Sequence, residues 1–206
     1  MSYYFTILSP TDVPIFNIAF GTSKSGGDGI ARFRFPDAAQ NTYMTQFIIH
    51  SSLDMLEEAQ WMMGNMYLKH IDTYPPASAY ISAFLTPSGT RFLLLHQPPQ
   101  PNLPPSGAGG GGGGIGSSTM SLSPSGMGMG GSGLFGGSGM GSSGRTSSSI
   151  AANPTAPQTE EAVRQFMVEV YEAYVKTVMS PFYKRGTEIR SPVFRSKVSA
   201  AGRKWL

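Results

Sequence analysis

Apolar positions recur between residues 42 and 63 with the period of an α-helix, and they fall on two sides of that helix. With about 100° of rotation per residue, one broad arc collects small and apolar residues and is wide enough to lie across a β-sheet. Residue 41 or 42 is a suitable N-cap, and a Gly-Asn pair at 64–65 is a stop signal. The arc comprises Ile48, Ile49, Ser52, Leu53, Met55, Leu56, Ala59, Met62 and Met63.

The opposite side of this predicted helix is not uniformly polar. It carries aromatic side chains together with a histidine and an aspartate, and Glu57 and Glu58 flank it. A helix that is apolar on one side needs only one sheet to cover it, whereas aromatic side chains on a second side need another cover. Either a further element of this chain or a partner protein has to supply that cover. The residues on this side are Tyr43, Phe47, His50, Asp54 and Trp61.

Five short runs rich in strand-forming residues predict a β-sheet. Residues 9–12 have turn composition and would join the first two runs as a hairpin, while proline-containing turns separate the last three. The fifth run, RFLLLH, is almost continuously apolar, as expected of a strand that is covered on both faces or lies centrally. The runs span residues 3–8, 13–20, 66–74, 79–86 and 91–97.

Two stretches lack such patterns. Residues 21–41 are rich in Gly, Ser and polar side chains and are predicted to form a loop, in which Phe33 and Phe35 are candidates for local packing. Residues 98–158 consist mainly of Pro, Gly, Ser and Met, and they have too few apolar side chains to offset the entropy of ordering. We expect this second stretch to be a disordered insertion within one domain, because the segment after it cannot fold alone.

Two amphipathic helices are predicted after the insertion. Thr159 is the expected N-cap of the first, and Ser180 with Pro181 ends it. Ser191 and Pro192 open the second helix, with the proline in its first turn. The apolar stripes that would face the sheet are Val163, Phe166, Met167, Val170, Tyr174 and Val178 in the first helix, and Phe194, Val198, Ala201 and Trp205 in the second.

The predicted order of elements is therefore β-β-α-β-β-β-α-α, an α+β fold within a single domain of residues 1–206. The simplest architecture is one five-stranded, mainly antiparallel sheet with helices packed on its faces. We expect the first helix to cover one face of this sheet, and the second helix to join it there or to flank it.

The composition includes no cysteine, which excludes disulfide bonds and cysteine-based metal or redox sites. The net charge is only +3, but eight Lys or Arg residues follow position 175 against the single acid Glu188. Such a basic end fits solubility and the dipole of the last helix, or contact with an anionic membrane or an acidic partner. No nucleic-acid-binding module accompanies this charge, so nucleic acid is not an expected ligand.

No catalytic, cofactor or metal site is predicted. His50, His70 and His96 lie in three different elements, without acids or cysteines at metal-ligand spacing. There is no P-loop and no nucleophile elbow, and the G-x-G-x-x-G matches lie within the glycine tract, not between a strand and a helix. No apolar run is long enough to span a membrane, and the N-terminus lacks the features of a secretory signal. We therefore expect a soluble intracellular protein that is not an enzyme.

Several segments together resemble the sedlin family, whose members are small subunits of the TRAPP vesicle-tethering complex with a longin-type fold. The segments are QFIIHSSLDMLEEAQW, NMYLKHID, AYISAFLTPSGTRFLLLH, VYEAYVKTVMSPFY and IRSPVFRSKV. The resemblance implies a non-catalytic adaptor that links the small-subunit core to larger subunits in endoplasmic reticulum to Golgi tethering and Rab GTPase activation. It also implies a cytoplasmic protein, peripheral at these membranes and without cofactors, whose partners are other TRAPP subunits.

Membership of an assembly would explain the second side of the first helix. Aromatic side chains beside an acid are typical of protein interfaces, in which the aromatics act as anchors. We therefore predict that the partner-binding residues are Tyr43, Phe47, Asp54 and Trp61; the alternative is that the last helix folds over them. Two other functions stay open at this point: a longin-domain trafficking regulator outside TRAPP, such as the regulatory head of a SNARE, and a small ligand carrier.

Overall fold

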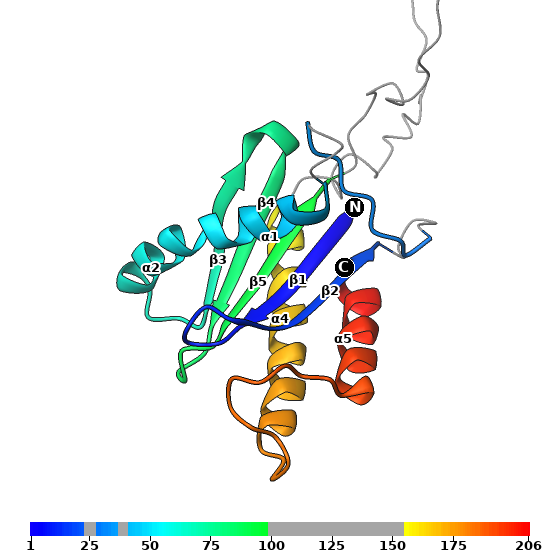
Figure 1. The fold of residues 1–206 in the computed structure, drawn as a ribbon. Helices are drawn as coiled ribbons and strands as arrows, with labels where there is room; N and C mark the ends of the chain where they lie inside the picture. The colour runs from blue at the N-terminus through cyan, green and yellow to red at the C-terminus, as the bar shows by residue number, and fades with distance from the viewer. Residues whose placement is uncertain (23–27, 37–40, 99–154) are drawn as a thin grey trace, which may run out of the picture. The chain divides into compact units, whose positions relative to one another are not determined.

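The computed structural model of the protein describes residues 1–22, 28–36, 41–98 and 155–206. The five strands of this described part form one sheet in the order β2-β1-β5-β4-β3, and every neighbouring pair is antiparallel (Figure 1). The fifth strand lies at the centre, which confirms the prediction from its continuous apolar run. The strands are β1 (Ser2–Leu8), β2 (Pro14–Gly21), β3 (Tyr67–Tyr74), β4 (Ala79–Leu85) and β5 (Arg91–Gln97).

The helices of the described residues are α1 (Asn41–Ser51), α2 (Leu53–Met62), α4 (Pro157–Val178) and α5 (Pro192–Trp205), with a 3-10 turn, η3 (Pro75–Ala77), between β3 and β4. α1 and α2 cover one face of the sheet, and α4 and α5 cover the other (Figure 1). The α+β fold has the predicted order, with helices on the faces of the sheet as predicted. Of the two expected placements of the second helix, joining the first on its face is wrong, because α4 lies on the opposite face. Side chains alternate along β5, so Leu93 packs beneath α1 and α2 whereas Leu94 packs beneath α4 and α5.

The predicted helix of residues 42–63 is divided into α1 and α2 at Ser52. This serine is fully buried, and its hydroxyl donates a hydrogen bond to the carbonyl oxygen of Ile49 at 2.8 Å instead of capping α2. The backbone bonds from Ser52 to Ile48 and from Leu56 to Ser52 continue across the junction, so the chain bends there without reversing (Figure 1). A serine that bonds to the preceding turn commonly bends a helix in this way.

Only part of the predicted apolar arc lies against the sheet. α2 contacts the edge strand β3, so little of the sheet lies beneath its last turn. Met55, Met62 and Met63 are consequently exposed, and their predicted place in the core is wrong. α2 ends at Met62, and the backbone of Met63 is extended, one residue before the predicted Gly-Asn stop. The buried members of the arc are Ile48, Ile49, Ser52 and Leu56.

α4 begins at Pro157, inside the range predicted to be an insertion, and residues 99–154 of that range lie outside the described residues. The N–H groups of Thr159 and Glu160 both donate to the carbonyl oxygen of Ala156, at 2.9 and 3.0 Å. Thr159 therefore lies within the first turn, and its predicted role as N-cap is wrong. The helix starts one turn earlier because the proline, whose φ suits the first turn, has no N–H that needs a partner.

α5 begins as predicted. The hydroxyl of Ser191 accepts a hydrogen bond from the N–H of Phe194 at 3.3 Å, and Pro192 occupies the first turn. This helix approaches β2 closely, since a Cβ at Gly202 would lie only 2.8 Å from the ring of Phe20. The small residue thus lets the end of the chain pack against the edge of the sheet.

Residues 28–36 form a loop that is tied to β5. The rings of Phe33 and Phe35 stack with centroids 6.2 Å apart, and Phe35 joins the core beneath α1 and α2. The side chain of Gln97 donates to the carbonyl oxygen of Arg34 at 2.7 Å and accepts from its N–H at 2.8 Å. The candidate local packing of the two phenylalanines is therefore confirmed.

Candidate partner-binding surface

The predicted partner-binding residues all lie on the exposed side of α1 and α2, and we call Tyr43, Phe47, Asp54 and Trp61 the outer ridge. The aromatic side chains are 53%, 60% and 87% exposed for Tyr43, Phe47 and Trp61. α5 packs with α4 on the other face of the sheet, so the alternative in which the last helix covers these residues is wrong. A large aromatic area on one side of two consecutive helices is typical of a surface that is covered in a complex.

The acids of α2 differ in their surroundings. Glu57 contacts the guanidinium of Arg91, whereas Asp54 and Glu58 make no ion pair with any residue that the structure describes. Asp54 is one turn away from Glu57 and exposed. The outer ridge therefore combines aromatic side chains with a carboxylate whose charge is not neutralised within the described part of the subunit.

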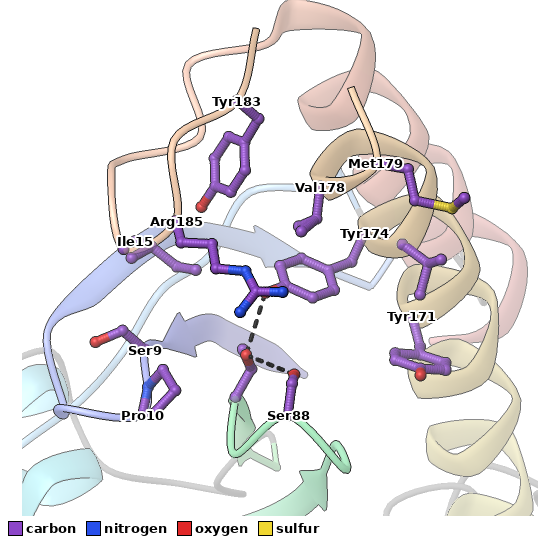
Figure 2. A pocket seen from close by; sticks show the side chains of 13 residues that line it. Ser9, Pro10, Ile15, Ser88, Tyr171, Tyr174, Val178, Met179, Tyr183 and Arg185 are labelled. Atoms are coloured by element: carbon purple, nitrogen blue, oxygen red, sulfur yellow. Dashed lines mark hydrogen bonds between the residues drawn. The ribbon is translucent and has the colours of Figure 1, made fainter. Parts of the chain in front are cut away.

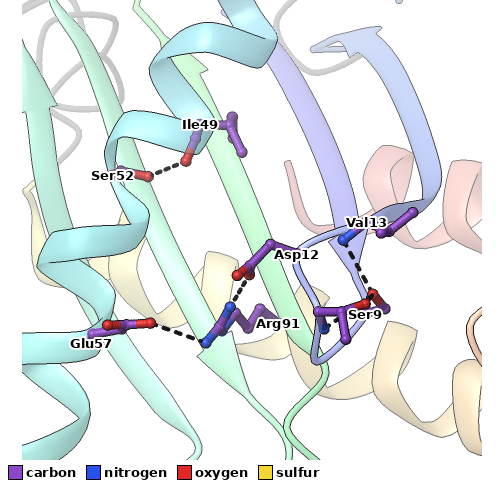
Figure 3. A network of polar contacts seen from close by, with 8 residues as sticks. Ser9, Asp12, Val13, Ile49, Ser52, Glu57 and Arg91 are labelled. Carbon is purple, nitrogen blue, oxygen red and sulfur yellow. Dashed lines mark hydrogen bonds and ion pairs between the residues drawn. The ribbon is translucent and has the colours of Figure 1, made fainter.

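Arg91 anchors α2 to the sheet (Figure 3). Its Nη2 lies 3.4 Å from Oε1 of Glu57, and its Nη1 contacts the carboxylate of Asp12 in the turn between β1 and β2. Asp12 adopts the left-handed conformation with φ of 60°, in a turn where the hydroxyl of Ser9 accepts the N–H of Val13 at 3.1 Å. Sequence reasoning missed this network, and its only signal is that Arg91 is the single charged residue of β5.

The histidines do not come together, and the described ranges contain no group of three side chains that could hold a metal ion. His50 is exposed on α1, and His70 shares a hydrogen bond of 2.8 Å with the hydroxyl of Thr73. His96 is buried, its ring stacks on Tyr80 at 5.5 Å, and neither of its nitrogens has a hydrogen-bond partner among the described residues. Burial, with a smaller effect of His70, lowers the pKa of His96 to about 4, so the ring is neutral at pH 7.

The basic C-terminal region is partly engaged in contacts within the subunit. Lys204 pairs with Glu169 at 2.9 Å and lies over the ring of Trp205, while Arg190 pairs with Glu188 at 2.8 Å. These pairs are exposed and contribute at most about 1 kcal/mol each. Arg195 lies over the ring of Phe16, 5.2 Å from its centroid. The other Lys and Arg residues of this region make no ion pair with any residue that the structure describes.

Two apolar side chains protrude between α4 and α5. Met179 is 77% exposed and Phe182 is 93% exposed, and Lys184 and Arg185 follow them closely in the chain. Figure 1 shows this connection extending past the end of α4, away from the sheet. None of the described helices combines the length and the hydropathy needed to cross a lipid bilayer.

One five-stranded antiparallel sheet between two layers of helices is a longin-like architecture. A family model described as Sedlin matches residues 7–204, and the chain belongs to this family.

Relatives in three organisms align with nearly the whole chain. The transport protein particle 20 kDa subunit of Schizosaccharomyces pombe is 27% identical over 206 residues, which cover 100% of both chains. The probable trafficking protein particle complex subunit 2 of Drosophila melanogaster is 26% identical over 205 residues, covering 100% of this chain and 97% of the relative. The trafficking protein particle complex subunit 20 of Saccharomyces cerevisiae is 29% identical over 235 residues, covering 100% of this chain and 99% of the relative.

Proposed function

We propose that this protein is a non-catalytic adaptor subunit of a TRAPP complex, in which it links the small-subunit core to larger subunits. Its relatives in two yeasts and a fly are named as subunits of the transport or trafficking protein particle, and they align over almost their full lengths. The observation that carries the proposal is the outer ridge, because its aromatic side chains and its carboxylate are left uncovered by the described helices of the subunit.

The outer ridge has the chemistry of an interface anchor. Burying an aromatic side chain removes about 150–250 Å² from water, and aromatic residues dominate the few positions that carry most of an interface's binding energy. Trp61 is the most exposed of the three aromatic members and therefore has the most aromatic surface left to bury. The carboxylate of Asp54 would meet a cation or a hydrogen-bond donor of the partner, which gives the contact its orientation.

Co-purification of the other subunits with tagged variants tests this proposal. Trp61→Ala and Phe47→Ala should each weaken capture of a neighbouring subunit by roughly 2 kcal/mol, about thirtyfold in dissociation constant. Asp54→Ala should weaken it by a smaller factor. Thermal unfolding should stay close to that of the unchanged protein, because all three side chains are exposed.

Two exposed positions on the other side of the sheet provide matched controls. Val193→Ala removes exposed apolar surface from α5, and Glu172→Ala removes an exposed acid from α4. Neither change should affect capture of the neighbour that the outer ridge binds. Normal capture by stable Trp61 and Phe47 variants would show that the ridge is not the contact.

In this role the protein acts in the cytoplasm, peripherally at endoplasmic reticulum and Golgi membranes. Activation of a Rab GTPase belongs to the assembled complex. Nucleotide exchange on the GTPase, measured with the purified subunit and with the complete assembly, separates the contribution of the subunit from that of the complex. We expect exchange only with the assembly. Exchange catalysed by the isolated chain would contradict the adaptor role.

A second contact, with an anionic membrane, is favoured by the protruding segment between α4 and α5. Phe182 and Met179 are exposed beside Lys184 and Arg185, and an aromatic tip next to cations is a common form of peripheral membrane contact. Flotation with phosphatidylcholine vesicles, with and without phosphatidylserine, tests it. Binding should require the anionic lipid, fall with salt and weaken in Phe182→Ala; binding that ignores lipid charge would refute it.

A further inference from the structure

A pocket of about 240 Å³ lies on the face opposite the outer ridge, at the C-terminal end of α4 (Figure 2). Segments that are distant in sequence enclose it: the β1–β2 turn, the β4–β5 turn, the last turns of α4 and the connection to α5. Most of its wall is apolar. The apolar and aromatic side chains of the wall are Ile15, Tyr171, Tyr174, Val175, Val178 and Met179.

The polar groups at one side of the pocket are held in place by one another. The hydroxyl of Thr90 lies 3.1 Å from that of Tyr174 and 3.3 Å from that of Ser88, as the dashed lines in Figure 2 show. On the neighbouring turn, the hydroxyl of Ser9 accepts a hydrogen bond from the N–H of Val13 at 3.1 Å. The pocket is thus preformed, and a ligand need not order these side chains on binding.

Arg185 contributes the only cationic side chain of the described pocket lining (Figure 2). It makes no ion pair with any described residue, because Glu188, the acid of the same segment, is paired with Arg190 at 2.8 Å. The segment itself is fixed by the hydroxyl of Tyr183, which donates to the carbonyl oxygen of Thr187 at 2.9 Å. An apolar pocket therefore opens beside an exposed positive charge that no described acid neutralises.

We propose that this pocket binds a segment of a partner protein in which one large apolar side chain enters the pocket and an adjacent carboxylate pairs with Arg185. Pockets for drug-sized ligands span roughly 300–1,000 Å³, so about 240 Å³ suits one leucine- or phenylalanine-sized side chain better than a lipid acyl chain. The planar guanidinium binds a carboxylate through paired hydrogen bonds, which selects an acid over a neutral group. Because the pocket and the outer ridge lie on opposite faces, one subunit can hold two neighbours at once.

A pair of small probes tests the chemistry on the full chain. N-acetyl-phenylalanine carries the ring and the carboxylate, and N-acetyl-phenylalaninamide carries the ring without the charge. With methyl-labelled methionine and valine, the NMR signals of Met179 and Val178 should shift with both probes, while that of the distant Met62 should not. The acid should bind roughly two- to fivefold more tightly than the amide, as expected for an exposed ion pair.

Two charge variants separate the pocket from general basic charge. Arg185→Gln should abolish the preference for the acid and leave binding of the amide unchanged. Lys184→Gln removes an exposed cation of the same segment that does not line the pocket and does not free Glu188 from Arg190, and it should keep the preference. Equal binding of acid and amide by the unchanged protein, or equal loss of the preference in both variants, would overturn the assignment.

A third variant and a lipid probe complete the test. Val178→Trp should fill the pocket and abolish the shifts with both probes, with the thermal transition measured to establish that the protein is folded. Unchanged shifts at Met179 in this folded variant would place the probes elsewhere and refute the proposal. Short-chain phosphatidylserine that shifts Val178 of the unchanged protein at lower concentrations than N-acetyl-phenylalanine would assign the pocket to lipid and would likewise overturn it. Val178 is the reporter here because Met179 also belongs to the proposed membrane contact. None of these outcomes depends on the role of the outer ridge.

Discussion

Arg91 of the central strand β5 and Glu57 of α2 form an ion pair across 34 residues of sequence, with Nη2 3.4 Å from Oε1. The same guanidinium contacts Asp12 (Figure 3), and the arginine side chain is only 13% exposed. One side chain thus joins a strand, a helix and a turn. It helps to set the position of α2 on the sheet, and therefore the direction in which Trp61 points.

Arg91→Met should destabilise the protein by about 1–3 kcal/mol, because it leaves Asp12 without its partner while retaining most of the apolar volume. Urea or thermal unfolding measures the change. Arg164→Met is the matched control, since its pair with Glu161 is exposed on both sides and its loss should change stability little. Equal costs for the two variants would mean that Arg91 does not act as a partly buried anchor.

Gly21→Ala should destabilise the protein by about 2 kcal/mol or more, because the new Cβ would lie 2.3 Å from the carbonyl oxygen of Ile30 and the backbone would have to move. Gly64→Ala is the control, since a Cβ added there would have nothing within 4 Å. Chemical unfolding of both variants should therefore show a loss for the first and little change for the second. A normal unfolding free energy for Gly21→Ala would show that the loop does not pack as described.

His96 predicts a pH dependence of stability. Its pKa in the folded state is about 4, below the ordinary value of 6.5, so the unfolded chain takes up a proton here first as the pH falls. The free energy of unfolding should therefore decrease between about pH 6.5 and pH 4, by up to about 3 kcal/mol from this group. His96→Leu should reduce that slope relative to the unchanged protein. Identical slopes in the two proteins would exclude His96 as the cause.

The Gly- and Ser-rich residues 105–150 lie outside the described residues, and their composition predicts that they add little to stability or to subunit binding. Deleting them should leave subunit binding unchanged, and it should leave the unfolding free energy unchanged or raise it by about 1 kcal/mol through the shorter connection. Unfolding and co-purification of the shortened chain measure both effects. Lost binding would mean that the segment takes part in assembly.

Sequence reasoning placed the strands within a residue or two, because an apolar run bounded by turn residues is a local signal. β5 shows this most clearly, since its unbroken apolar run predicted a strand buried on both sides. The position of Thr159 was misjudged because a proline two residues earlier opens α4 equally well. The bend at Ser52 was missed because helical periodicity alone does not show that the serine is fully buried and bonded to Ile49.

The amino-acid sequence by itself determined the elements of this protein, their order and the aromatic outer side of the first helix. Only the tertiary structure decided which face of the sheet each helix covers, because both faces of β5 are apolar and periodicity cannot choose between them. This placement of the helices on the two faces leaves the outer ridge exposed and brings Arg91 to Glu57. It also forms the pocket beside Arg185. Each of these depends on residues far apart in the chain, whose contacts are set by how the whole core is buried and not by local pattern.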